Sequence, residues 1–202
     1  MKVRNIIAFV ALSLLVACFN LNKLSLYNLS DQYGNTGFTI LDALVFNHGG
    51  DSATLFIPIN SEDMAVATDE ETGEAHTTVA ISYELFETYE SKHILDSASL
   101  RIRKKLGMPD DTLVTFRIHY PAVRKYILKV MLTDLNRVDD VERYLCLDNT
   151  SPYSANNYLL FDAGGDIIFS NIIGPYEEFR IRSSCTATDS LYVRYYRRSF
   201  PL

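Results

Sequence analysis

The chain has 202 residues, of which 48 % are hydrophobic, so it is long enough to bury a core and to form one or two domains. It carries 25 Asp and Glu against 19 Lys and Arg. This acidic balance argues against nucleic acid as a partner, because phosphates favour a basic protein face. The 13 tyrosines and 11 phenylalanines, without any tryptophan, are typical of a β-rich protein.

Residues 1–17 have the organisation of a secretory signal peptide. Lys2 and Arg4 form a short positive region, and an apolar run over residues 6–17 is broken only by Ser13. The run is well short of the ~20 apolar residues that a membrane-spanning helix needs. Its length and its flanks instead favour a signal peptide.

The stretch LVAC (15–18) ends this run and resembles the lipobox of bacterial lipoproteins. The resemblance implies cleavage before Cys18 and lipidation of that residue, which would anchor the protein to a membrane through more than one acyl chain. Residues 18–30 then form the lipid anchor and tether. No Asp and no acidic cluster follows Cys18 directly, so the same resemblance implies the outer membrane of a diderm bacterium, with the protein facing the periplasm. A plain signal peptide or an uncleaved apolar start is the alternative.

The rest of the chain alternates apolar and polar residues with a period of two, which places one face of a strand on a core and the other in water. The alternating runs are 40–46, 53–59, 78–87, 97–103, 112–120, 158–162, 166–170, 178–183 and 190–198. Turn sequences separate them. Paired glycines in HGGD (48–51) and AGGD (163–166) supply the positive φ angles of tight hairpins, and GMPDD (107–111) is another turn.

Short strands with turns between them predict an all-β fold, an immunoglobulin-like β-sandwich over residues 31–148. DNTSPYSAN (148–156), rich in Asp, Asn, Ser and Pro, is the candidate boundary. We expect a second, small β-rich domain over 153–202, and we expect it to be incomplete because few strands remain before the chain stops.

The segment 117–137 carries a pattern common in immunoglobulin-like modules. A turn at Pro121 precedes a long strand that has Tyr126 near its start and an acid at its end. We expect the Tyr126 ring in the core and its hydroxyl on the backbone near Pro121, which is the arrangement called a tyrosine corner. A simple long amphipathic strand is the alternative.

Two other features have candidate roles. A disulfide between Cys146 and Cys185 is possible in a secreted protein, and buried free thiols are the alternative. The segment 134–140 offers oxygen ligands for calcium from four side chains: Asp134, Asn136, Asp139 and Asp140. It lacks the glycine and the distal Glu of an EF-hand, which favours a solvated turn over a metal site.

Catalytic signatures are missing from the sequence. It contains no Gly-x-Ser-x-Gly elbow, no phosphate-binding loop ending in Gly-Lys-Ser/Thr and no His-Glu-x-x-His. We therefore predict a protein that is not an enzyme and needs no cofactor. Paired carboxylates for glycoside hydrolysis stay open, because such pairs form in space rather than in sequence.

Several stretches together resemble a known family. They are NLSDQYG, ALVFNHGGDSATLFIPI, ISYELFETYESKHILDSAS, YILKVMLTDLNR, NNYLLFDAGGDIIFS and LYVRYYRRSFPL. In this order they resemble the upstream region of GWxTD-domain-containing lipoproteins of the Bacteroidota type. The chain has no Trp, so the domain that names the family is absent. The resemblance implies a cell-envelope lipoprotein and no catalytic residue.

Two functional hypotheses follow. In the first, the protein is an outer-membrane-anchored β-sandwich that acts as a non-enzymatic interaction or structural module, with the membrane and an envelope protein as partners. In the second, it binds or hydrolyses glycans or peptides. The sequence does not identify a small-molecule ligand.

Overall fold

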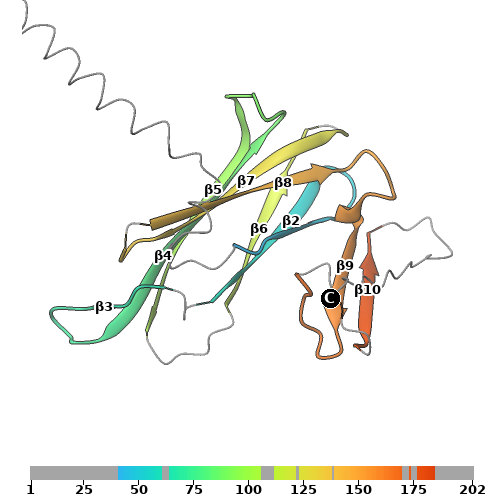
Figure 1. Cartoon of the computed structure of the whole chain (residues 1–202). Helices are drawn as coiled ribbons and strands as arrows, with labels where there is room; N and C mark the ends of the chain where they lie inside the picture. The colour runs from blue at the N-terminus through green and yellow to red at the C-terminus, as the bar shows by residue number, and fades with distance from the viewer. Residues whose placement is uncertain are drawn as a thin grey trace, which may run out of the picture. The chain divides into compact units, whose positions relative to one another are not determined.

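The computed structural model describes residues 41–60, 64–105, 112–121, 123–137, 139–169, 173 and 177–184. The chain divides into two compact units, Met1–Thr39 and Ile40–Leu202, and the described residues all belong to the second. They form antiparallel strands, and their only helix is the short 3-10 turn η3 (Ala155–Asn157) (Figure 1). The predicted all-β fold is confirmed. No helix in this part of the chain is long and apolar enough to cross a membrane.

The smaller sheet has three strands in the order β1-β2-β6. Their bounds are Leu44–Asn47 for β1, Ser52–Ile59 for β2 and Thr112–His119 for β6. The predicted HGGD hairpin joins β1 to β2. Gly49 and Gly50 have φ angles of 83° and 71°, a conformation that glycine adopts without steric cost. This turn sets the register that brings Asn47 opposite Ala53.

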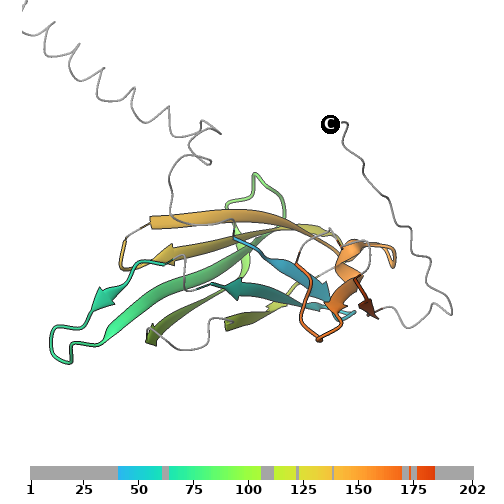
Figure 2. The same cartoon turned by 60° about the horizontal axis from the view of Figure 1, so that its bottom comes forward.

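The larger sheet contains four long strands in the order β5-β4-β7-β8. Their bounds are Ala75–Phe86 for β4, Ile94–Lys105 for β5, Lys125–Asp134 for β7 and Asp139–Asp148 for β8. The two-residue strand β3 (Ala67–Thr68) pairs with the start of β4. Figure 2 shows β7 and β8 running side by side. Of the four long strands described in this sheet, β5 and β8 are therefore the edges.

Alternation along the strands decides which faces form the core. On β4, Val79, Ile81, Tyr83 and Leu85 are at most 3 % exposed, whereas the residues that alternate with them are partly exposed. Tyr83 of β4 packs against Phe116 of β6 with 5.4 Å between ring centroids. The apolar faces of the two sheets thus pack against each other as a β-sandwich, which removes both from water.

The alternating pattern does not predict strand β8, because Arg143 interrupts the apolar row between Val141 and Leu145. Arg143 lies on the same face as Val130, its partner on β7. It donates to the Leu41 carbonyl oxygen at 2.7 Å. An inward-pointing charge is a common feature of edge strands, where it discourages pairing with another chain.

The β5 and β6 edges of the two sheets are joined through one carboxylate. Asp96 of β5 accepts hydrogen bonds from the Tyr83 hydroxyl at 2.9 Å and from the His119 backbone N–H at 2.8 Å. Burial, followed by the hydrogen bond to Asp96, raises the pKa of Tyr83 well above its ordinary value. The phenol therefore stays protonated and can act as the donor.

The β1 and β8 edges are joined through amide side chains. The Asn47 amide group donates to the Asp148 carbonyl oxygen and to Oδ1 of Asn157, each at 3.0 Å. Asn156 adds a donor to the Val45 carbonyl oxygen at 3.4 Å. Since Asn156 and Asn157 belong to η3, these bonds also tie the segment after β8 to the first strand of the sandwich.

After η3, β9 (Tyr158–Asp162) and β10 (Phe179–Ser183) form a separate two-stranded antiparallel ribbon. The predicted AGGD turn follows β9, and Gly165 has a φ of 98°. The expected strand over 166–170 is reduced to one bridge, Phe161 to Ile167. The strand expected over 190–198 lies outside the described residues. The predicted boundary at 148–156 falls inside the second compact unit, and a separate domain over 153–202 stays a prediction.

Candidate interaction surface

The predicted covalent sites fall largely outside the described residues. Cys18, the lipidation candidate, and Cys185 are not among them. Cys146 lies on β8 and is exposed. The alternative that Cys146 is a buried thiol is therefore wrong, and a Cys146–Cys185 disulfide stays a prediction.

Tyr126 lies where the sequence placed it, as the second residue of β7. Its side chain is 1 % exposed, and its ring centroid is 5.7 Å from that of Tyr120. The Tyr120 hydroxyl donates to the Ser52 carbonyl oxygen at 3.1 Å. Two tyrosine rings thus close this end of the core, while the Tyr126 hydrogen bond that defines a tyrosine corner stays a prediction.

The calcium candidates are engaged in structural hydrogen bonds. Asp134 is fully buried, and its carboxylate accepts the backbone N–H of Ala65 at 2.7 Å and of Asn136 at 2.9 Å. The Asn136 amide donates to the carbonyl oxygens of Ala65 and His76. Asp140 is exposed, and the Asp139 side chain is outside the described set. Among the described residues, no group of three His, Cys, Asp or Glu could hold a metal ion. Asp134 and Asn136 instead fasten the segment before β3 to the sandwich.

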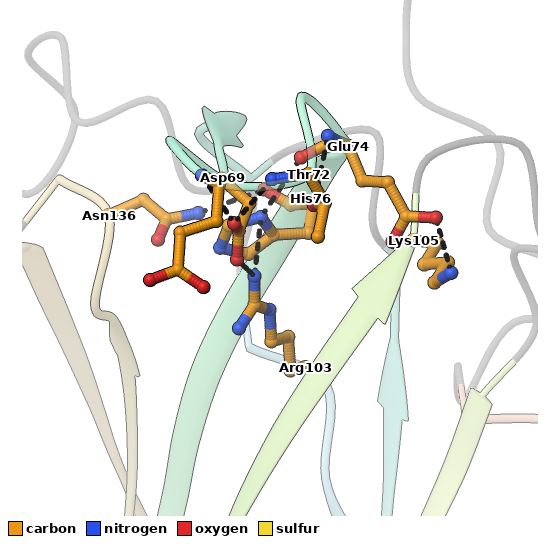
Figure 3. Close-up of polar contacts among 8 residues, drawn as sticks. Asp69, Thr72, Glu74, His76, Arg103, Lys105 and Asn136 are labelled. Carbon is orange, nitrogen blue, oxygen red and sulfur yellow. Dashed lines mark hydrogen bonds and ion pairs between the residues drawn. The ribbon is translucent and has the colours of Figure 1, made fainter.

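The acidic loop between β3 and β4 is a hairpin tied to edge strand β5 (Figure 3). Arg103 donates to Asp69 at 2.6 Å, and Lys105 donates to Glu74 at 2.7 Å. The Arg103 hydrogen bond, followed by the backbone N–H groups of Thr72 and Glu71, lowers the pKa of Asp69 to about 2. Asp69 and Glu74 each meet a cation of β5, so these two ion pairs hold the hairpin against that strand.

An apolar row crosses the outer face of the larger sheet near one end of its strands. Strand pairing places Ile94, Phe86, Ile127 and Cys146 next to one another across β5, β4, β7 and β8. The outer face is the one turned away from the core, and Ile94 is 43 % exposed. Exposed apolar side chains that are contiguous, rather than scattered, mark interaction sites.

Two tyrosines extend this row. Tyr89, in the turn after β4, is 72 % exposed, and Tyr144 of β8 is 46 % exposed. Their ring centroids are 5.3 Å apart. Since β7 lies between β4 and β8, the turn reaches across β7 to make this contact. We call the whole set the tyrosine patch: Phe86, Tyr89, Ile94, Ile127, Tyr144 and Cys146.

Ion pairs border the tyrosine patch along β7 and β8. Lys125 meets Asp148 at 3.2 Å on one side of Ile127, and Lys129 meets Glu142 at 2.5 Å on the other. The hydrogen bond that Lys129 donates to Glu142 raises the pKa of Lys129, so the lysine stays charged. An aromatic centre with a charged rim is the usual anatomy of a protein interface.

One tyrosine of the tyrosine patch lies beside a carboxylate. The Tyr144 hydroxyl lies 3.4 Å from Glu142, and burial, then the Glu142 charge, raises the pKa of Tyr144. The Tyr144 phenol therefore stays protonated at neutral pH and can act as the donor. The sequence analysis missed this surface, because Tyr89 lies in a turn and Tyr144 in the strand that was overlooked.

Comparison of the chain with protein-family models, with curated proteins and with solved structures finds no match. The resemblance to GWxTD-domain-containing lipoproteins therefore stays a prediction from the sequence.

Proposed function

We propose that this protein is a non-enzymatic interaction module of the bacterial cell envelope, held at the outer membrane by lipid on Cys18. Its β-sandwich would display the tyrosine patch to an envelope protein. The observation that carries the proposal is the patch itself, three of whose side chains are more than 40 % exposed within a border of ion pairs. Tyrosines in such settings often dominate the binding energy.

An immunoglobulin-like topology belongs to this proposal, and the strand order supports it. Leaving β3 aside, the first, second and fifth strands share one sheet, and the third, sixth and seventh share the other. A constant-type immunoglobulin domain has the same division. The fourth strand, β5, departs from it, because it pairs with the third strand rather than the fifth.

The lipid anchor would strengthen binding between the displayed patch and its partner. Confinement to a membrane raises the effective concentration of the module for a partner in the same membrane. The test is intact-mass spectrometry of the full chain expressed in a diderm host, beside a Cys18→Ala variant. We expect loss of residues 1–17 and a gain of acyl mass, both absent from the variant. An unmodified Cys18 would contradict the anchored form of the proposal.

The patch is tested separately by site-specific photo-crosslinking in the anchored full chain. A photoreactive residue at position 89 should give one discrete adduct, and the same residue at Glu70 on the acidic hairpin should not. Tyr144→Ser should abolish the adduct, whereas Tyr153→Ser should leave it, because Tyr153 is 83 % exposed but outside the patch. Equal adducts from positions 89 and 70 would contradict a binding role for the patch.

A glycan- or peptide-binding role is the second candidate, and the exposed ring pair Tyr89–Tyr144 favours it. Aromatic faces offer rigid apolar area to a flat ligand. Titration of the protein with peptidoglycan fragments would detect such binding. Hydrolysis of those fragments that disappears on replacement of one carboxylate would overturn the non-enzymatic proposal.

A further inference from the structure

One face of the β9–β10 ribbon gathers two arginines and an aromatic ring. Arg180 pairs directly with Phe161, and Arg182 pairs with Leu159. Successive side chains of a strand point to opposite faces, so these four side chains share one face. Leu159 is buried, whereas both arginines are exposed.

A hollow of about 320 Å³ opens beside them and is lined by Phe161, Gly165, Arg180, Ile181 and Arg182. The Arg182 guanidinium carbon lies 5.0 Å from the Phe161 ring centroid. Arg180 donates to the Ala163 carbonyl oxygen at 3.3 Å. Both guanidinium groups are thus held at the hollow, one by a ring face and one by a backbone oxygen, and each keeps further N–H donors.

Neither arginine meets a carboxylate within 4 Å among the described residues. Other strand cations of this acidic chain do, for example Lys129 with Glu142. The nearby Asp162 is engaged elsewhere, since its Oδ1 accepts the backbone N–H groups of Gly165 and Asp166. Asp162 also follows Phe161 on the strand and so points to the opposite face.

We propose that this face binds an oxyanion carried on an apolar group, either a carboxylate or a phosphate. A guanidinium stacked on a ring still presents its planar fork to an oxyanion, and Arg180 supplies a second cation two residues away on the same face. The apolar part of the ligand would occupy the hollow beside the Phe161 ring. This site is separate from the tyrosine patch and does not depend on the proposed function.

The test is a titration of the full chain labelled with ¹⁵N-glycine, whose nine glycines give a sparse NMR spectrum. Gly165 lines the hollow, and Gly49 and Gly50 in the β1–β2 turn serve as internal references. The probes are benzoate, phenyl phosphate and inorganic phosphate. We expect saturable shifts of the Gly165 signal, with dissociation constants in the millimolar range and unchanged references.

Variants show which side chains bind the probes. Arg180→Gln and Arg182→Gln should each weaken binding about tenfold, since each removes a charge-assisted hydrogen bond. The control is Arg101→Gln, which removes an exposed arginine of β5 and should change nothing. Phe161→Leu should weaken benzoate more than inorganic phosphate, because only benzoate has a ring to place beside Phe161.

The two aromatic probes separate the sources of the oxyanion. Tighter binding of benzoate supports a carboxylate ligand, and tighter binding of phenyl phosphate supports a phosphorylated one. The proposal is overturned if no probe shifts Gly165, if Arg101→Gln weakens binding as much as Arg182→Gln, or if inorganic phosphate binds as tightly as phenyl phosphate.

Discussion

The sandwich and the β9–β10 ribbon are built from similar alternating strands but differ in what they bury. On β4 and β7 every second side chain is buried, because a second sheet covers one face. In the ribbon strands, Leu159 is the only buried side chain. A two-stranded ribbon has marginal stability alone. Its attachment through Asn157 of η3 to Asn47 therefore helps to hold it in place.

The largest effect should come from truncating matched leucines in the two regions. Leu128 of β7 and Leu159 of β9 are equally buried, at 0 % and 1 % exposed. We expect Leu128→Ala to lower the free energy of unfolding by about 2–5 kcal/mol. Leu159→Ala should lower the free energy of unfolding by less than half as much, because the ribbon can collapse into the cavity that the substitution leaves. Chemical denaturation measures both, and equal losses would mean that ribbon and sandwich unfold as one cooperative unit.

The next effect concerns the β5–β6 edge of the sandwich. Asp96→Ala leaves the His119 N–H without its acceptor, while the Tyr83 hydroxyl keeps only the Arg117 carbonyl oxygen at 3.2 Å, so we expect a loss of about 1–3 kcal/mol. Ser97→Ala, the adjacent residue on the outer face, is the control. A double-mutant cycle with Tyr83→Phe should show coupling, and strict additivity would argue that the hydroxyl does not depend on Asp96.

A smaller change is expected for Asn47→Ala at the attachment of the ribbon. The variant loses two hydrogen bonds but also removes Asn47 Oδ1, a buried oxygen without a hydrogen-bond partner in the described structure. We expect a net loss of about 1 kcal/mol. In the ¹⁵N-glycine spectrum, Gly165 should broaden or shift while Gly73 stays in place. Movement of both signals would place the effect in the sandwich as a whole.

The smallest effect is a pH dependence at the β3–β4 hairpin. The pKa of Asp69 is lowered from its ordinary 3.8 to about 2. The stabilisation of the hairpin by ionised Asp69 is therefore complete above pH 4 and disappears as the pH falls through about 2. The pair is exposed, so salt should weaken it further. The Gly73 signal, whose N–H bonds to the Asp69 carbonyl oxygen, should report this change. Arg103→Gln should move the midpoint of the Gly73 pH titration toward 3.8, the ordinary pKa of Asp69. An unchanged midpoint would contradict the ion pair.

The alternating sequence by itself determined the all-β fold and the inward faces of β2, β4, β6 and β7. It did so because a period of two exposes one face of each strand, and burying that face requires a second sheet. The paired glycines likewise determined the β1–β2 turn. β8 escaped prediction because the reason for its inward Arg143, a bond to Leu41, lies 102 residues away in sequence.

Only the tertiary structure decided which polar residues join the sheets and which surfaces stay open. In the sequence, Asp96 and Asn47 look like ordinary surface residues and Asp134 like a calcium ligand, and their roles come from partners distant in the chain. The tyrosine patch and the arginine face arise in the same way. Sequence pattern specifies the direction of each side chain within its own strand, whereas strand order and register, set by packing, decide which side chains become neighbours.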